Sequence, residues 1–295
     1  MSLDSSRWRD LTGSANIRAP LFGFVIKSVL FGMTILQAYQ YFMNYVNDSR
    51  TRKLTIVAVC SLECIHFAFS SKMMYSSLLP SSKDASTNIV WCMKVLTTVK
   101  TMLMLLVQSF YLYLVWILAD NMTLKRELVR LLRSISVLTF FFTVGVGVAF
   151  LAYLEQTGNI FNFSMAFEHV IYISVGSAAA VDCVISAIMS FVLFNAASRT
   201  GGKRSGNVVN DLVLFFVGTG MLNAISKILI IALYASNPSS VLYLAVQFSI
   251  PSLYANSILA LFNAKSRLKE KMDASVELRV SSALFFGDAL EAEDE

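Results

Sequence analysis

The sequence predicts an all-α membrane protein, a seven-transmembrane helix bundle with its N-terminus outside and its C-terminus in the cytoplasm. Three observations lead to this prediction: an apolar composition, seven apolar runs of membrane-spanning length, and positive charge that alternates between loops. The chain of 295 residues is 56% hydrophobic and 15% charged, with a mean hydropathy of +0.63. A soluble domain is roughly 45–50% apolar and about 25% charged, so lipid is the expected solvent.

Each predicted element is an apolar run whose length fits a helix. A membrane-spanning helix needs about 20 mostly apolar residues, whereas a barrel strand needs roughly 9–11 alternating ones. A polar extracellular segment, residues 1–20, precedes the transmembrane domain, residues 21–268, and a polar cytoplasmic tail, residues 269–295, is predicted to be largely disordered. The predicted spans are, in order, residues 21–45, 54–79, 89–119, 128–154, 169–197, 209–234 and 241–263.

The loops predict the orientation. Lysine and arginine occur in the first loop ("NDSRTRK"), the third, the fifth ("SRTGGKRSG") and after the last span, but not in the fourth or in the sixth ("ASNPSS"). The positive-inside rule therefore places the C-terminus in the cytoplasm. Three N-terminal arginines, Arg7, Arg9 and Arg18, run against this rule. The net charge of +5 is then explained by cytoplasmic loops, so no nucleic-acid partner is expected.

A glycosylation sequon agrees with this orientation. "NFS" at Asn162 falls in the fourth loop, which is predicted to lie outside, so Asn162 is the predicted glycosylation site. The sequons at Asn47 and Asn121 fall in loops that are predicted to lie inside. Together with the basic inner loops, the outside sequon suggests the plasma membrane as the location.

Ionisable residues inside the spans are the candidate site. Such residues are costly in lipid and usually face a bundle interior, a cavity or a partner. Glu63, His66 and Asp182 lie near the middle of their spans, while Lys100 and Lys227 lie in the predicted outer half. Acids at mid-depth with amines above them fit either a polar cavity that opens outward or a set of buried ion pairs.

The spacing of Glu63 and His66 places both on one helix face. One hypothesis makes them a ligand-binding or proton-handling pair; the other makes them an interhelical hydrogen-bond clamp with Asn223 or Asn256. Gln108 is a further structural polar candidate, since one amide in a span is typical of an interhelical hydrogen bond. Three lysines near the predicted outer ends, Lys27, Lys72 and Lys94, are expected to extend toward the membrane surface.

Several function classes lack their motifs. The sequence contains no Gly-rich phosphate loop, no HExxH and no G-x-S-x-G, and its cysteines and histidines lack a metal-binding spacing, so neither a cofactor nor a metal is predicted. The last span has no lysine that would hold retinal as a Schiff base. It has "IPSLY" where class A receptors have NPxxY, and the third span ends in "ILADNM".

The favoured hypothesis is a receptor-like protein that senses a small molecule. Its pocket would lie between the second, third, fifth and sixth spans and open outward, and the basic loops would contact a cytoplasmic protein. One alternative is a proton-coupled transporter or channel with Glu63, His66 and Asp182 as a relay. Another is an intramembrane enzyme such as a terpene cyclase, with Glu63 and Asp182 as general acids. A structural role is a further alternative.

Several stretches together resemble one family. They include "LFGMTILQAYQYFMNYVNDS", "LECIH", "LLVQSFYLYLVWIL", "AAAVDCVISAIMSFVL", "VLFFVGTGMLNAI" and "SLYANSILALFNAKSRL", within residues 23–268. They are similar to a large basidiomycete family of integral membrane proteins classed as a domain of unknown function. The resemblance implies seven helices and a fungal membrane setting, and no activity. Its motif positions include Glu63, where members typically have Asp, and His66, Asp182, Asn256 and Asn263.

Overall fold

The computed structural model describes residues 14–46, 48–78, 85–120, 126–156, 165–199, 203–236 and 242–273. Within these ranges the long elements are all α-helices, and no strand occurs there. All seven helices are long and apolar enough to cross a membrane, which confirms the predicted all-α, multi-pass fold class. They are α2 (Ser14–Asn44), α3 (Arg50–Leu78), α4 (Ala85–Asp120), α5 (Arg126–Gln156), α6 (Met165–Arg199), α7 (Lys203–Ser236) and α8 (Leu242–Asp273).

Each predicted span corresponds to one helix, and most helices extend beyond the apolar run. The largest extension is at the end of α8, which continues through "AKSRLKEKMD" to Asp273. A helix satisfies its own backbone hydrogen bonds, so it need not stop where the apolar sequence stops. Pro251 lies inside α8 without ending it.

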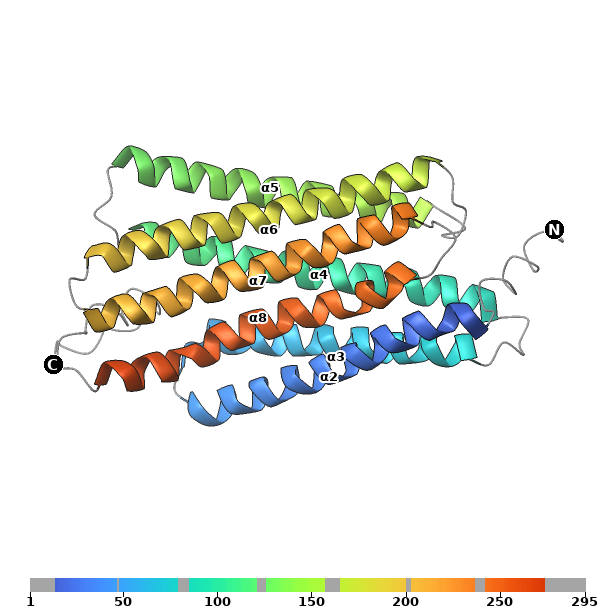
Figure 1. The fold of residues 1–295 in the computed structure, drawn as a ribbon, viewed down its shortest axis with the longest axis horizontal. Helices are drawn as coiled ribbons and strands as arrows, with labels where there is room; N and C mark the ends of the chain where they lie inside the picture. The colour runs from blue at the N-terminus through green and yellow to red at the C-terminus, as the bar shows by residue number, and fades with distance from the viewer. Residues whose placement is uncertain are drawn as a thin grey trace.

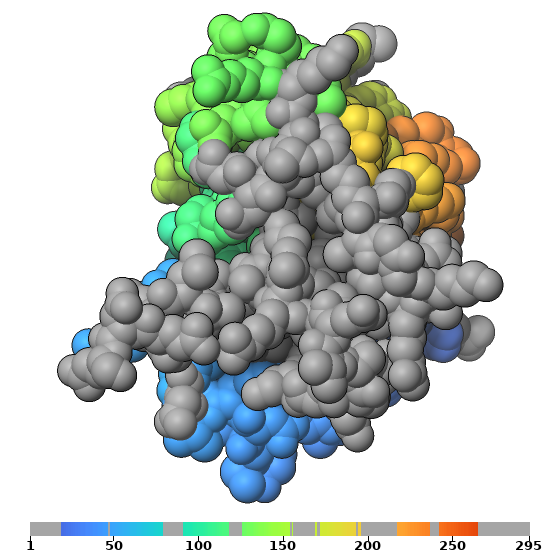
Figure 2. All heavy atoms as spheres, turned by 90° about the vertical axis from the view of Figure 1, so that its left-hand side faces the viewer, coloured from blue at the N-terminus to red at the C-terminus, as the bar shows by residue number. Residues whose placement is uncertain are grey.

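The helices lie side by side and run alternately in opposite directions along the bundle (Figure 1). The chain starts α2 at one end of the bundle and finishes α8 at the other. The first and last of these helices, α2 and α8, pack against each other and close the bundle. Inside it, α4 contacts α3, α5, α6 and α8. In the end-on view, α5 lies at one edge and the blue α2–α3 region at the opposite edge (Figure 2).

The helices differ in how much of their surface is covered. Of the seven spans, α8 is the most buried and α5 the least. The bare surface of α5 carries large apolar side chains, among them Leu138 and Phe141, at 71% and 66% exposure. Exposure of such a contiguous apolar surface to water is unfavourable, whereas its contact with lipid is not. Because α8 contacts α2, α3, α4 and α7, polar groups on different faces of α8 reach different parts of the interior.

Candidate functional site

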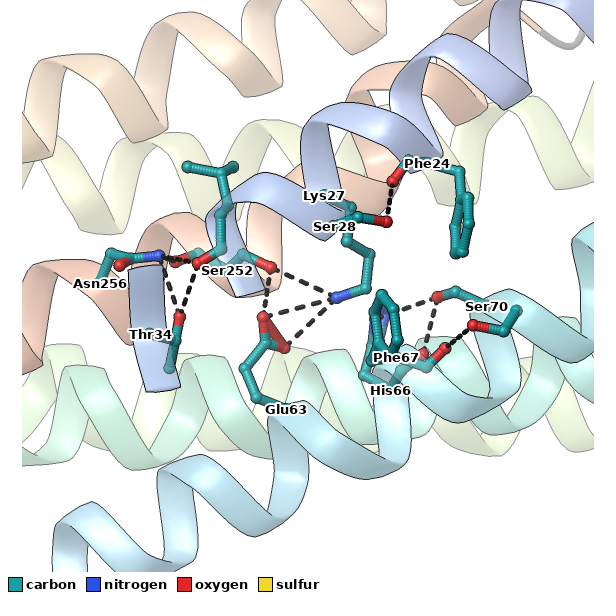
Figure 3. Close-up of polar contacts among 12 residues, drawn as sticks. Phe24, Lys27, Ser28, Thr34, Glu63, His66, Phe67, Ser70, Ser252 and Asn256 are labelled. Atoms are coloured by element: carbon teal, nitrogen blue, oxygen red, sulfur yellow. Dashed lines mark hydrogen bonds and ion pairs between the residues drawn. The ribbon is translucent and has the colours of Figure 1, made fainter. Parts of the chain in front are cut away.

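The first buried polar cluster joins α2, α3 and α8 through Lys27, Glu63 and Ser252 (Figure 3). The Lys27 ammonium lies 3.4 Å from Glu63 Oε2 and 3.3 Å from Ser252 Oγ. Ser252 Oγ in turn donates a hydrogen bond to Glu63 Oε1. The side chains of Lys27 and Glu63 have no exposed surface, so this is a fully buried, hydrogen-bonded ion pair.

The expectation that Lys27 extends toward the membrane surface is therefore wrong. Residue 27 falls near the start of the predicted span, but α2 begins earlier, at Ser14, and the side chain faces α3 and α8. Of the other two lysines in this group, Lys72 is exposed and its ammonium lies 5.3 Å from the centre of the Trp91 ring. Lys94 Nζ, in the first third of α4, donates to the carbonyl of Glu155 at the end of α5, at 3.3 Å.

His66 shares a helix face with Glu63 but bonds elsewhere. Its Nδ1 lies 3.4 Å from Ser70 Oγ, within the same helix, and the ring is 3% exposed. For Glu63 the geometry fits the interhelical clamp, with partners other than those named from the sequence, whereas the described hydrogen bond of the His66 ring stays within α3. The described hydrogen bonds of the Glu63 carboxylate go to Lys27 and Ser252, and neither Asn223 nor Asn256 takes part.

Asn256 instead joins α8 to α2. Its Nδ2 donates to the Leu30 carbonyl at 2.9 Å and lies 3.0 Å from Thr34 Oγ1. One further contact follows two turns along, where Asn263 Nδ2 donates to the Gln37 carbonyl at 2.9 Å. Both asparagines thus link the same two helices, and the geometry gives Asn256 the interhelical hydrogen bond that a structural polar residue was expected to make.

The second buried cluster is centred on Asp182 of α6. Lys227 Nζ and Tyr254 Oη each lie 2.5 Å from Asp182 Oδ2, and Gln108 Nε2 donates to Oδ1 at 2.9 Å. The Lys227 ammonium also donates to Tyr254 Oη at 2.6 Å and to the Ala178 carbonyl at 3.0 Å. All three donors of this ammonium therefore have acceptors, and the carboxylate neutralises its charge.

A small cavity of about 20 Å³, with several polar side chains on its wall, borders the second cluster. Gln108, Asp182, Asn223 and Tyr254 are among the residues on its wall. A polar space of more than about 10–15 Å³ can hold one water. The Oε1 atom of Gln108 is buried without a described hydrogen-bond partner, which makes it a suitable acceptor for that water. Asn223 lies at this cavity rather than at Glu63.

A larger cavity, of about 130 Å³, lies between α4, α5, α6, α7 and α8. Its wall includes Met93 near the start of α4 and Phe150 near the end of α5. It also includes Tyr243, close to the start of α8. The cavity therefore lies toward the end of the bundle where the even-numbered helices begin, which is the right-hand end in Figure 1.

Lys100 differs from the other intramembrane ionisable residues. It lines the large cavity beside Thr97 and Thr101, and its ammonium makes no hydrogen bond or ion pair within the part of the chain that the structure describes. Lys227 also lines this cavity, but its charge is already matched by Asp182. Lys100 thus contributes one uncompensated positive charge to a largely apolar wall.

The structure divides the predicted single pocket into two sites. The sequence placed one pocket between the second, third, fifth and sixth spans, which are α3, α4, α6 and α7. Lys100 and Lys227 do share a cavity, but Glu63 and His66 do not line it. They face α2 and α8 instead, because α8 lies between the two groups and presents Ser252 to one and Tyr254 to the other.

Three residues of these clusters were not predicted: Lys27, Ser252 and Tyr254. The loop between α2 and α3 is short, so residues at similar distances from it lie at similar depths in antiparallel helices. Lys27 is about one turn farther from this loop than Glu63, an offset that a lysine side chain can span, so this comparison could have found their ion pair. No comparable signal marks Ser252 or Tyr254, because single hydroxyls are common in apolar helices.

The described residues contain no group of three or more His, Cys, Asp or Glu side chains arranged to hold a metal. Asn162, the predicted glycosylation site, lies outside the described residues. Within the described residues, the two clusters supply two buried ion pairs, and the large cavity contains a cation that has no partner there.

Comparison with known proteins finds a family match for part of the chain. Residues 178–267 match a family of unknown function, DUF6534. The chain matches no curated protein and no solved structure. The matched segment runs from α6 to α8 and includes Asp182, Lys227 and Tyr254, so it carries the acid, the amine and the hydroxyl of the second cluster. The predicted resemblance to a family of unknown function is thus supported over residues 178–267, whereas a basidiomycete origin stays a prediction.

Proposed function

We propose that the protein is a receptor-like membrane protein that binds a small organic molecule in the large cavity lined by α4, α5, α6, α7 and α8. The observation that carries this proposal is the Lys100 ammonium, which has no hydrogen-bond or ion-pair partner among the described residues, on the wall of an otherwise mostly apolar cavity of about 130 Å³. Ligand sites in proteins combine an apolar lining with a few polar groups that fix orientation. An ionisable residue inside a membrane bundle is by default a functional candidate.

The proposed direction of access follows from the loop charges. The positive-inside rule places the end where α4, α6 and α8 begin on the outer side, and the cavity lies toward that end. The ligand would enter from there, and the plasma membrane is the proposed location. The opposite end, with its basic loops, would contact a cytoplasmic protein. The ligand would shift the equilibrium between two arrangements of the helices, and the cytoplasmic protein would bind one arrangement better than the other.

The transporter and enzyme alternatives have less support. A relay through Glu63, His66 and Asp182 would have to cross α8, because Glu63 bonds to Ser252 and Asp182 bonds to Tyr254. Residues two apart on a helix face in nearly opposite directions. Both acids are engaged in ion pairs, whereas a general acid must reach a substrate.

A matched pair of glycine variants tests the proposal. Gly147 lines the large cavity, where an added Cβ would lie 3.4 Å from Thr101 Cγ2, in ordinary contact. Gly145, on the same helix, is exposed and has nothing within 4 Å of such a Cβ. Gly147→Leu should therefore fill the cavity, while Gly145→Leu should point into lipid and serve as the control.

The experiment screens a library of small organic compounds by thermal shift, with the protein in nanodiscs. A compound that stabilises wild type and Gly145→Leu but not Gly147→Leu would support the cavity as the ligand site. It should also change hydrogen exchange at the cytoplasmic ends of α6 and α7. Stabilisation that persists in Gly147→Leu would contradict the site, and uptake of the compound into liposomes would assign a transporter instead.

A further inference from the structure

We infer that the ligand of the large cavity is a small amphipathic organic anion, such as an aryl or short alkyl carboxylate, bound through Lys100. This inference rests on the proposed function and specifies the chemistry of its ligand. It follows from the charge of the cavity wall, from the polarity of that wall, and from its size.

The charge of the wall is the first step. Among the described residues that line the cavity, Lys100 and Lys227 are the charged ones, and no Asp or Glu is among them. Asp182 lies behind Lys227 and pairs with it at 2.5 Å. The two lysines and this one acid leave a single positive charge, located at Lys100. A charge inside a membrane bundle is costly unless it is paired, so a ligand that supplies one negative charge is favoured over a neutral or cationic one.

The polar groups near Lys100 are the second step. The Thr97 and Thr101 side chains lie on the same helix and line the cavity with it. The Thr101 hydroxyl donates to the Thr97 carbonyl at 2.9 Å, so its proton is already used. Gln247 of α8 also lines the cavity, and no hydrogen bond of its side chain occurs within the described ranges. Its amide can donate to an anionic oxygen, which the lysine alone would leave partly unsolvated.

The apolar wall is the third step, because it separates an organic anion from an inorganic one. Phe142 and Phe150 of α5, with Met104 of α4 and Ile230 of α7, give the wall its mainly hydrophobic character. The volume of about 130 Å³ is close to that of an engineered apolar cavity of roughly 150 Å³ that binds benzene. A body of about one aromatic ring therefore fits, with its charged group toward Lys100.

Three probes of nearly one shape test the inference: phenylacetate, phenylacetamide and phenethylamine. Binding is measured by equilibrium dialysis of each radiolabelled probe against the full chain in phosphatidylcholine nanodiscs, with empty nanodiscs as the partition blank. Phenylacetate should bind wild type about tenfold or more tightly than the amide, since a charge-assisted hydrogen bond is worth more than a neutral one. Phenethylamine should show no binding above the blank.

Two lysine variants on one helix locate the charge. Lys100→Met keeps the length of the side chain and removes its charge, so phenylacetate binding should weaken by about tenfold or more and selectivity over the amide should vanish. Lys94→Met is the matched control, because Lys94 lies on α4 outside the cavity wall. Its ammonium donates to the carbonyl of Glu155 at the end of α5. Phenylacetate should bind Lys94→Met as it binds wild type.

Other outcomes separate the two proposals. If the amide or the amine binds wild type as tightly as the acid and Gly147→Leu abolishes that binding, the cavity is a ligand site but the anionic class is wrong. If no probe binds in a manner sensitive to Gly147→Leu, the inference is overturned, and the library screen decides the proposed function separately. Equal phenylacetate binding by wild type and Lys100→Met would also overturn it.

Discussion

The two buried ion pairs use the same chemistry in different surroundings. Lys27 and Glu63 are sealed between α2, α3 and α8, with no exposed side-chain surface, and neither described cavity reaches them. Asp182 and Lys227 make a shorter pair, at 2.5 Å, in which Lys227 lines the large cavity and Asp182 lines the small one. In each case α8 supplies a hydroxyl, from Ser252 or from Tyr254.

This difference gives the two pairs different roles: the sealed pair joins helices, and the other pair forms part of a cavity wall. A sealed pair holds helices together and leaves no room for a ligand, whereas a pair beside a cavity fixes the charge of that cavity. Asp182 neutralises Lys227, so the free charge of the large cavity is confined to Lys100. The comparison predicts that loss of a charge costs more stability at the sealed pair than at the pair beside the cavities.

The largest effect is expected from Glu63→Gln. The substitution keeps the shape of the side chain but leaves the Lys27 ammonium buried without a counter-charge. Breaking a buried pair from one side costs about 3–5 kcal/mol. Unfolding in mixed detergent and dodecyl sulfate micelles should show a loss of this size in the free energy of unfolding.

The double variant Lys27→Met with Glu63→Gln is the control for this prediction. It removes both charges, so it should be clearly more stable than Glu63→Gln alone. If the double variant is as unstable as the single one, the loss comes from packing, and the sealed pair is not an electrostatic clamp.

A smaller effect is expected from Asp182→Asn. Lys227 keeps its hydrogen bonds to Tyr254 and to the Ala178 carbonyl, and water in the large cavity, which Lys227 lines, can solvate the ammonium. The expected loss is about 1–3 kcal/mol, measured by the same unfolding assay. A loss as large as that of Glu63→Gln would show that the large cavity gives Lys227 no access to water, and the distinction between the pairs would fail.

The architecture was predictable because it depends on many residues at once. Seven apolar runs long enough to cross a membrane, with few charges inside them, have few alternatives to seven helices. The chemistry at Asp182 was predictable in part, since a mid-depth acid with an amine above it suggests an ion pair. That ion pair, to Lys227, is present.

What could not be predicted depends on which helices are neighbours. Glu63 and His66 were placed with Asp182 because all three have similar depth, but depth does not determine which way a residue faces. The position of α8 decides this, because it contacts both α2 and α7 and separates the two clusters. Lys27 was misassigned for a related reason, since its distance from the apolar boundary was considered without its distance from the loop that joins α2 to α3.

The smallest effects test the same distinction with neutral groups. Ser252→Ala removes the hydroxyl that bonds to Glu63 and Lys27, and Tyr254→Phe removes the one that bonds to Asp182 and Lys227. Interhelical hydrogen bonds in membrane proteins contribute about 0.6 kcal/mol on average and about 1.7 at most.

The sealed pair has no water to replace a lost hydroxyl, so the loss in free energy of unfolding for Ser252→Ala should be near the upper value, about 1.5 kcal/mol. Tyr254 borders the small cavity, where a water can replace part of its hydrogen bonding. The loss for Tyr254→Phe should therefore be near the average. Both are measured by the unfolding assay used for the acid variants. If Tyr254→Phe costs more than Ser252→Ala, the hydroxyl of Tyr254 holds the second pair together more firmly than water can.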